Sequence, residues 1–172
     1  QPEGDVNFAG LLERVADVCA KVGVPVIAKE VGWGFSEQNA RDLKAAGVSA
    51  IDVAGAGGTS WSQVEYYRAP TEYHAVVAAA FADWGIPTAD AIQYAAKGAS
   101  GLPIIASGGL KDGIDVAKSI ALGATLGGLA GHFLKAADQS VEAVEDFIRI
   151  LTRQLQVAML VSGAKDIAVL QN

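Results

Sequence analysis

Four short apolar runs recur along the 172-residue chain, and longer amphipathic segments separate them. Each run is six to nine residues long, without the alternation of a half-exposed strand, and is typical of strands covered on both faces. The runs are VPVIAKEV (24–31), AIDVAG (50–55), LPIIAS (102–107) and TLGGLAGHF (125–133), the last relaxed by its glycines. The pattern therefore predicts four strands.

The segments around these runs have the apolar spacing of helices. Gly23 is predicted to end the first helix, and Ser36 and Gly47 are predicted to cap the second at its two ends. A tyrosine-bearing segment follows the glycine-rich GAGGTSW and continues to about Arg68. The expected helices span 6–22, 36–47, about 72–82, about 88–97, 111–123 and about 140–162, and a short closing segment starts at Ala164.

Strands that alternate with ten or more helical residues indicate parallel βα units with the helices outside the sheet. The units differ too much in sequence to be called a repeat. Four such units could form a small doubly wound sheet, or half of an eight-stranded (β/α) barrel. The length of the chain is that of one domain, or at most two.

The carboxyl ends of the predicted strands carry small or polar residues. Ligands bind at this end of parallel α/β sheets, where backbone N–H groups of glycine turns can surround a phosphate. The strand ends supply, in chain order, Lys29 and Glu30; Ala54, Gly57, Gly58 and Thr59; Ser107, Gly108 and Gly109; and Ala130 and Gly131. In PIIASGGLKDG (103–113) the chain passes from strand to helix start without a bulky side chain. These residues predict a phosphate site.

The same residues also have structural interpretations. Gly108 and Gly109 alone would more often form a tight turn, and Thr59 alone would more often be a helix N-cap. Lys29 lies within an apolar strand, where an amine is costly unless an anion compensates it, so a ligand-facing position is favoured. Glu30 should lie on the other face and pair with a neighbouring helix.

The remaining reactive residues give weaker signals. Cys19 is the only cysteine, so a disulfide framework is excluded and a core position is expected. His74 and His132 have no carboxylates at metal-binding spacing, so no metal site is predicted. The tryptophans are Trp33, Trp61 and Trp84. They fall in predicted loops after strands, where indoles usually cover planar or apolar groups.

Composition and charge restrict the partners. The chain is 51% hydrophobic and has a formal net charge of −6 without a long basic run, which argues against nucleic acid. No window reaches the roughly 18 apolar residues of a membrane span and no signal peptide is visible. With its lone Cys19, the chain is expected in a reducing, cytoplasmic compartment. It starts with Gln1 rather than methionine, which indicates a processed or trimmed chain.

Four stretches resemble the type 2 isopentenyl diphosphate isomerases: VPVIAKEVGWG, DVAGAGGTSW, FADWGIPT and ASGGLKDGIDVAKSIALGA. The resemblance covers essentially the whole chain in order, since QPEGD is similar to the loop after the family's fourth strand and AGHFLKA to its eighth. It implies an FMN-dependent enzyme built on a (β/α)8 barrel. The fold would be the C-terminal half of that barrel, strands five to eight. The chain, residues 1–172, would be a single (β/α)4 unit that contains the FMN phosphate site.

The resemblance also implies roles for individual residues. The implied FMN-binding residues are Lys29, Thr59, Gly108, Gly109, Leu110, Ala130 and Gly131. Lys29 would approach the flavin ring, Thr59 would contact FMN near its phosphate or ribityl chain, and the other five would surround the phosphate. Trp84 would lie near the pocket for the isoprenoid tail.

The implied reaction interconverts isopentenyl and dimethylallyl diphosphate by a proton shift. Flavin reduced with NADPH would act as the acid–base group, and Mg2+ would neutralise the diphosphate. The family's catalytic Gln and Mg2+-binding Glu belong to a His-Leu-Asn-x-x-Gln-Glu motif upstream of QPEGD, which is absent here. We therefore expect that the N-terminal half of the barrel is missing, and that this chain alone is inactive.

Two other functions remain open. The chain could be a stand-alone half-barrel that binds FMN or phosphate without isomerase activity. It could also belong to another FMN-dependent barrel oxidoreductase, although FADWGIPT and SGGLKDG lack the His–Arg pair that a hydroxy acid oxidase would need. Half a barrel has two open strand edges. These would favour a homo-oligomer, or would mark a remnant of a longer enzyme.

Overall fold

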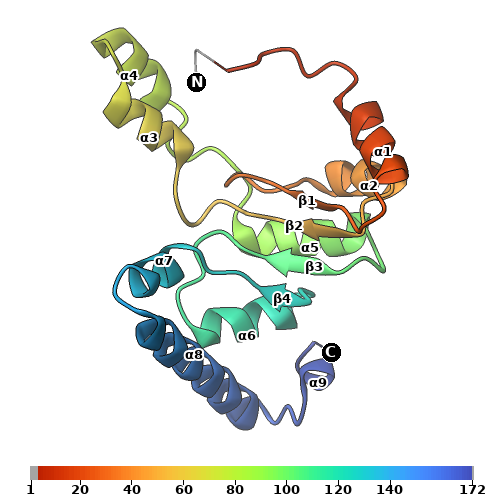
Figure 1. The fold of residues 1–172 in the computed structure, drawn as a ribbon, viewed down its shortest axis with the longest axis vertical. Coiled ribbons are helices and arrows are strands. Elements are labelled where there is room, and N and C mark those ends of the chain that lie inside the picture. Colours follow the sequence, from red (N-terminus) through yellow and green to blue (C-terminus); the bar gives the residue numbers. More distant parts are fainter. Residues whose placement is uncertain (1–3, 172) are drawn as a thin grey trace.

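The computed structural model describes residues 4–171 and forms an arc of parallel strands with helices packed around it (Figure 1). The strands are β1 (Ile27–Lys29), β2 (Ala50–Asp52), β3 (Ile104–Ala106) and β4 (Leu126–Gly127). They pair in parallel in the order β1-β2-β3-β4. The predicted parallel α/β arrangement is therefore confirmed. Gln1, on which the resemblance of QPEGD partly rests, lies outside the described residues.

Helices precede, connect and follow the strands. They are α1 (Leu11–Lys21), α2 (Glu37–Ala45), α3 (Trp61–Arg68), α4 (Glu72–Ala79), α5 (Thr88–Gly98), α6 (Gly113–Ala121), α7 (Gly131–Ala137), α8 (Val141–Ser162) and α9 (Ile167–Leu170). Ser36 caps α2 as predicted, because its side chain accepts a hydrogen bond from the Asn39 N–H. The C-cap of α2 is Ala46, and Gly47 follows it with φ +95°. Figure 1 shows α3 and α4 side by side, away from the sheet.

Two sequence expectations about elements were wrong. The run 125–133 is a strand only over Leu126–Gly127, and its last three residues instead open α7. The first helix begins at Leu11 and not at residue 6, because Gly10 is its N-cap and has the left-handed φ of 69°. In both places glycine separates two conformations that the apolar pattern treated as one.

The two faces of the sheet differ in their cover. Ile51, Val53 and Ile104 are fully buried in a core with residues of α2 and α5. The opposite face carries Lys29, whose register partner is Asp52, and Asp52 in turn pairs with Ile105. Paired residues of parallel strands point to the same face, so this face carries the charged groups Lys29 and Asp52, and the core residues of α2 and α5 pack on the other face.

Candidate functional site

Two glycine-containing loops pack against each other at the carboxyl ends of β2 and β3. A Cβ added at Gly57 would lie 2.9 Å from the Gly108 carbonyl oxygen, and one at Gly58 would lie 2.9 Å from the Gly109 nitrogen. Gly108 and Gly109 have φ of +107° and +87°, which other residues adopt only with strain. Backbone contact between neighbouring strand ends therefore explains why side chains are missing here.

The same loops present unpaired backbone donors. Within the described part of the chain, the N–H groups of residues 57–59 and 108–110 donate no hydrogen bond to a protein acceptor. Backbone N–H groups that converge at strand ends form favourable surroundings for an anion. The geometry of these loops thus has the donors that a phosphate site requires.

Hydrogen bonds fix the loops to their neighbours. Thr88 at the start of α5 donates from Oγ1 to the Gly108 carbonyl oxygen at 2.6 Å. The Ala56 N–H donates to the Ile86 carbonyl at 2.8 Å, which joins the β2 loop to the segment before α5. Buried Asp52 accepts a hydrogen bond from the Ser107 hydroxyl at 2.6 Å. Two side-chain hydrogen bonds and one backbone hydrogen bond therefore fix the loops after β2 and β3.

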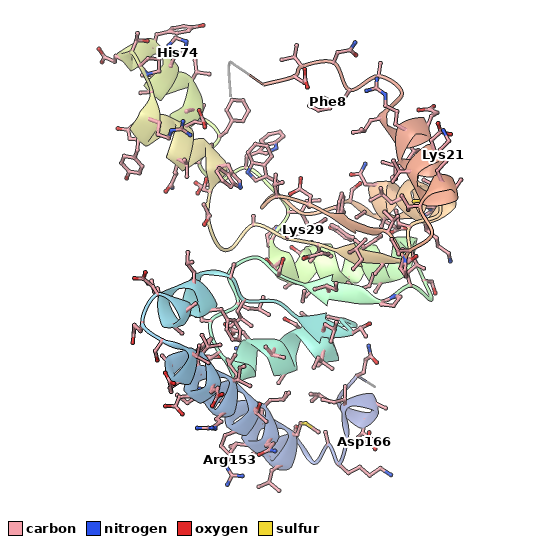
Figure 2. The ribbon with its side chains drawn as sticks, in the orientation of Figure 1. Phe8, Lys21, Lys29, His74, Arg153 and Asp166 are labelled. Carbon is pink, nitrogen blue, oxygen red and sulfur yellow. The ribbon has the colours of Figure 1, made fainter. Side chains whose placement is uncertain are left out.

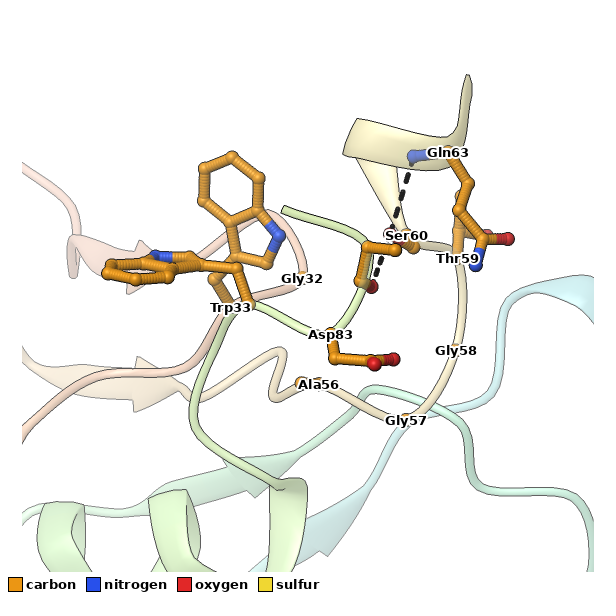
Figure 3. A pocket seen from close by; sticks show the side chains of 11 residues that line it. Gly32, Trp33, Ala56, Gly57, Gly58, Thr59, Ser60, Gln63 and Asp83 are labelled. Carbon is orange, nitrogen blue, oxygen red and sulfur yellow. Dashed lines mark hydrogen bonds between the residues drawn. The ribbon is translucent and has the colours of Figure 1, made fainter. Parts of the chain in front are cut away.

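A cavity of about 330 Å³ opens beside the β2 loop (Figure 3). Its lining residues are Gly32, Trp33, Ala56, Gly57, Gly58, Thr59, Ser60, Gln63, Ala82, Asp83 and Trp84. Figure 3 shows Gln63 and the Asp83 carboxylate near the 57–59 loop, with indole rings on the opposite side. The cavity thus combines an aromatic wall with polar groups, and it brings Thr59 and Trp84 together.

The other residues that the resemblance assigns to FMN do not line this cavity. Gly108, Gly109 and Leu110 border a second cavity of about 250 Å³, together with Thr88 and residues of α5 and α6. The Leu110 side chain belongs to the core, so only its backbone remains for a ligand. Ala130 is the N-cap of α7, and Gly131 begins that helix.

Lys29 is the last residue of the edge strand β1 and lies on the open face of the sheet (Figure 2). It is exposed, and its Nζ donates to the Glu30 carbonyl oxygen at 2.9 Å. The expected pairing of Glu30 with a helix was wrong. Its Oε2 instead accepts hydrogen bonds from the three following backbone N–H groups, at 2.6–2.8 Å, and so closes the loop 31–33.

The structure also decides the remaining structural interpretations. Ser60 is the N-cap of α3, so the N-cap interpretation of Thr59 was wrong. Trp61 begins α3 and does not lie in a loop; its Nε1 donates to the Val31 carbonyl at 2.7 Å. His74 contacts Thr71 at the distant end of the α3–α4 pair (Figure 2), and His132 stacks on Phe147.

Some residues of the site were not singled out from the sequence. Asp52 had a visible signal, because a carboxylate interrupts the apolar run AIDVAG just as Lys29 interrupts the first run. Asp83, Gln63 and Thr88 had none, since their places depend on how distant segments pack. Among residues 4–171, no group of three or more His, Cys, Asp or Glu side chains is placed to hold a metal ion. No helix of the described chain is long and apolar enough to cross a bilayer.

The parallel sheet, with helices between its strands, places the chain in the α/β class, and glycine-rich loops at the carboxyl ends of such strands are typical of (β/α) barrels. The chain belongs to the FMN-dependent dehydrogenase family, which it matches over residues 7–172.

Its relatives include two isopentenyl-diphosphate delta-isomerases. The protein from Nostoc sp. is 52% identical over 163 residues, which are 95% of this chain and 47% of that protein. The one from Rickettsia felis is 47% identical over 165 residues, which are 96% of this chain and 48% of that protein. The predicted resemblance is confirmed. The chain spans about half the length of the curated relatives it matches.

Solved structures of similar fold include two oxidases. Lactate oxidase from Pediococcus acidilactici has a TM-score of 0.72 and 23% identity, over 94% of this chain and 39% of that one. Mandelate oxidase with (S)-4-hydroxymandelic acid has a TM-score of 0.69 and 20% identity, over 93% and 39%. At this identity the likeness concerns the fold alone, and it confirms the predicted partial (β/α)8 barrel.

Proposed function

We propose that this chain is the FMN-binding half of an isopentenyl-diphosphate delta-isomerase. In this proposal, residues 1–172 form a single (β/α)4 unit that acts within a complete barrel. The observation that carries the proposal is the 47–52% identity to enzymes of that name over nearly the whole chain. The hydroxy acid oxidase alternative is not favoured, because the described residues that line the two cavities include no histidine or arginine.

The loops after β2 and β3 fit the phosphate of FMN. Their N–H groups at 57–59 and 108–110 have no acceptor within residues 4–171, and the backbone of one loop occupies the space that side chains on the other would need. Because the glycines have no side chains, an anion could approach the backbone N–H groups of these loops closely. We assign the phosphate to Gly108, Gly109 and the Leu110 N–H, with Ala130 and Gly131 on the neighbouring strand end.

The remaining site residues would act around the flavin. The exposed Lys29 ammonium, on the open face, would offset negative charge on the flavin ring, and Thr59 would contact the ribityl chain or the phosphate. Trp84 is 62% exposed and packs edge-on against Phe81, so its ring is available to cover an isoprenoid tail and to exclude water. When bound and reduced by NADPH, FMN would supply acid–base chemistry for the proton shift between isopentenyl and dimethylallyl diphosphate.

Other parts of the proposal concern groups beyond the described residues. The described side chains do not fit a Mg2+ site, so we derive no step through Mg2+; a glutamate of the complete protein would hold it on the diphosphate. We also propose a homo-oligomer, in keeping with the open strand edges of a half-barrel, and a cytoplasmic location, in keeping with the single cysteine.

Flavin titration of the purified chain tests the cofactor assignment. Intact mass and flavin absorbance on one sample would first show whether the 17.6 kDa chain retains flavin. FMN and riboflavin would then be titrated in parallel, with quenching of flavin fluorescence as the signal. FMN should bind at least about tenfold more tightly, because only FMN carries the phosphate. Equal affinities would contradict the phosphate site.

Activity requires a second experiment. The chain would be mixed with the half-barrel that precedes the matching region in a relative, and then supplied with FMN, NADPH, Mg2+ and isopentenyl diphosphate. Formation of dimethylallyl diphosphate, followed by NMR, is expected only in the mixture. Isomerisation by neither the mixture nor a fused chain would contradict the proposed reaction.

A further inference from the structure

Asp52 is a buried carboxylate at the end of β2. It is 9% exposed, and its Oδ1 accepts two hydrogen bonds, one from the Ser107 hydroxyl at 2.6 Å and one from the Ala54 N–H at 3.2 Å. Ala54 has φ +34°, an unusual conformation for a residue with a side chain. Ser107 is further tied through its carbonyl oxygen, which accepts from the Gly55 N–H at 3.0 Å. Asp52 therefore holds two strand ends together.

Ser107 lies on the open face of the sheet. Asp52 shares its face with Lys29 and Ile105 through the strand register, whereas Ile104 faces the helices. Ser107 follows Ile105 by two residues and reaches the Asp52 side chain, so it continues this face. On the neighbouring strand end Gly128 has no side chain, and a Cβ there would lie 3.2 Å from the Ser107 Cβ. Nothing on Gly128 covers the hydroxyl.

The bond to Asp52 determines what Ser107 can offer a ligand. A carboxylate only accepts hydrogen bonds, so the single hydroxyl proton of Ser107 is donated to Asp52. Only the lone pairs of Ser107 Oγ remain. Phosphate oxygens also act as acceptors, so a phosphate gains no hydrogen bond from this hydroxyl. A ligand hydroxyl or N–H group, in contrast, can donate a hydrogen bond to the free lone pairs of Ser107 Oγ.

We infer that Asp52 fixes Ser107 as a hydrogen-bond acceptor for a hydroxyl or N–H group of the bound flavin. The inference rests on the proposed function for its ligand, and it separates Ser107 from Gly108 and Gly109, whose N–H groups are donors. Flavin supplies donors of the required class in its ribityl hydroxyls and its ring N–H. Asp52 does not itself touch the ligand in this arrangement, and it acts as a positioning residue.

Riboflavin and FMN distinguish a flavin contact from a phosphate contact. Their dissociation constants would be measured for the unaltered chain, Ser107→Ala, Asp52→Ala and Asp52→Asn. Ser107→Ala should weaken both ligands by the same factor, about fivefold, which is the usual effect of one neutral hydrogen bond. Asp52→Ala should weaken both similarly, because the freed hydroxyl can turn. Asp52→Asn keeps an acceptor oxygen and should show a smaller loss.

The double variant tests whether the two residues act through one bond. The double variant Asp52→Ala/Ser107→Ala should lose no more flavin affinity than the single variant that shows the larger loss. Losses that multiply would overturn the inference. If Ser107→Ala lost affinity for FMN alone, Ser107 would bind the phosphate, and this would also overturn the inference. Unchanged affinity of Ser107→Ala for both flavins would overturn it as well. Ser162→Ala, at the end of α8, serves as the control, and neither affinity should change.

An NMR measurement tests the pair without flavin. The Ser107 hydroxyl proton should exchange slowly with water in the unaltered chain and in Asp52→Asn, and rapidly in Asp52→Ala. Circular dichroism would establish that each variant is folded. If the unaltered chain binds neither flavin, the proposed function fails, and the ligand assignment of Ser107 fails with it. If it binds both but Ser107→Ala has no effect, only the inference fails.

Discussion

The Thr88 hydroxyl donates a 2.6 Å hydrogen bond to the Gly108 carbonyl oxygen, and this bond joins the start of α5 to the turn after β3. The same carbonyl lies against Gly57 in the neighbouring loop. The position of the 108–110 N–H groups therefore depends on a side chain twenty residues earlier in the chain.

Replacing Thr88 with valine keeps the shape of the side chain and removes this donor. The Gly108 carbonyl would lose its partner in a half-buried position, so Thr88→Val should lower the free energy of unfolding by about 1–2 kcal/mol. Urea denaturation measures this loss. Thr88→Ser retains the hydroxyl and should recover most of it. Equal losses in the two variants would mean that packing of the methyl group matters and the hydrogen bond does not.

Gly109, like Gly108, has no room for a side chain. Its φ of +87° disfavours any side chain, and an added Cβ would collide with the Gly57 carbonyl oxygen. Strain and overpacking together predict that Gly109→Ala lowers the free energy of unfolding by about 2–4 kcal/mol. The matched control is Gly23→Ala, because an added Cβ there has no heavy atom within 4 Å. That control should stay within about 1 kcal/mol of the unaltered chain. A tolerated Gly109→Ala would contradict the close packing of the loops.

Glu30 determines the conformation of the loop that carries Trp33. Three backbone N–H groups donate to its Oε2, so Glu30→Ala leaves three donors without an acceptor. The loop 31–33 should then open more readily, and its amide hydrogens should exchange about 10–100 times faster. Exchange monitored by NMR reports each amide separately. Glu30→Gln keeps an oxygen acceptor, so its amide exchange rates should lie between those of the unaltered chain and those of Glu30→Ala. Unchanged exchange at all three amides in Glu30→Ala would rule out this role.

Glu37 forms an ion pair with Lys97 at 2.9 Å, which connects α2 to α5, and a second one with Arg41 of α2 itself at 2.6 Å. The hydrogen bond from Lys97 is the main reason why the pKa of Glu37 lies below 4.5, and it outweighs the opposing effect of desolvation. A folded-state pKa below the unfolded value means that Glu37 stabilises the fold above about pH 4.5, and that this contribution is lost as the pH falls through the lowered pKa.

Glu37→Gln should therefore be less stable than the unaltered chain at pH 7, by a small amount, because Lys97 is exposed and ion pairs at the surface contribute little. The difference should vanish as the pH is lowered below the folded-state pKa. Urea denaturation at several pH values measures it. A difference that does not change with pH would show that the substitution acts through packing and not through charge.

Local signals in the sequence predicted the elements whose ends depend on nearby residues. Ser36 and Ser140 cap helices through their own side chains, and strand positions followed from apolar runs. The interpretation of Thr59 as an N-cap missed by one position, because the adjacent Ser60, which caps α3, has the same capping chemistry. The apolar pattern also treated 125–133 as one strand, since apolar spacing does not show where Gly127 and Gly128 allow the chain to turn.

The arrangement of the candidate site depends on contacts between distant segments. The contacts between Gly57 and Gly108, and between Asp52 and Ser107, cross about fifty residues of sequence. No local pattern reports such distances. The sequence identified the strand ends as the place of the site, because all parallel strands present their carboxyl ends at one edge. It did not show that Thr59 and Gly108 would border different cavities.

The open face and edges of the sheet have a thermodynamic consequence. The outer sides of β1 and β4 pair with no other strand among residues 4–171, and Ile27 and Leu126 are more than half exposed. The chain has 10853 Å² of accessible surface, whereas a compact monomer of 17.6 kDa has about 7,900 Å². A molecule or segment that covers the excess adds its binding free energy to the folded state alone. The melting temperature of this chain should therefore rise with the concentration of whatever covers that surface.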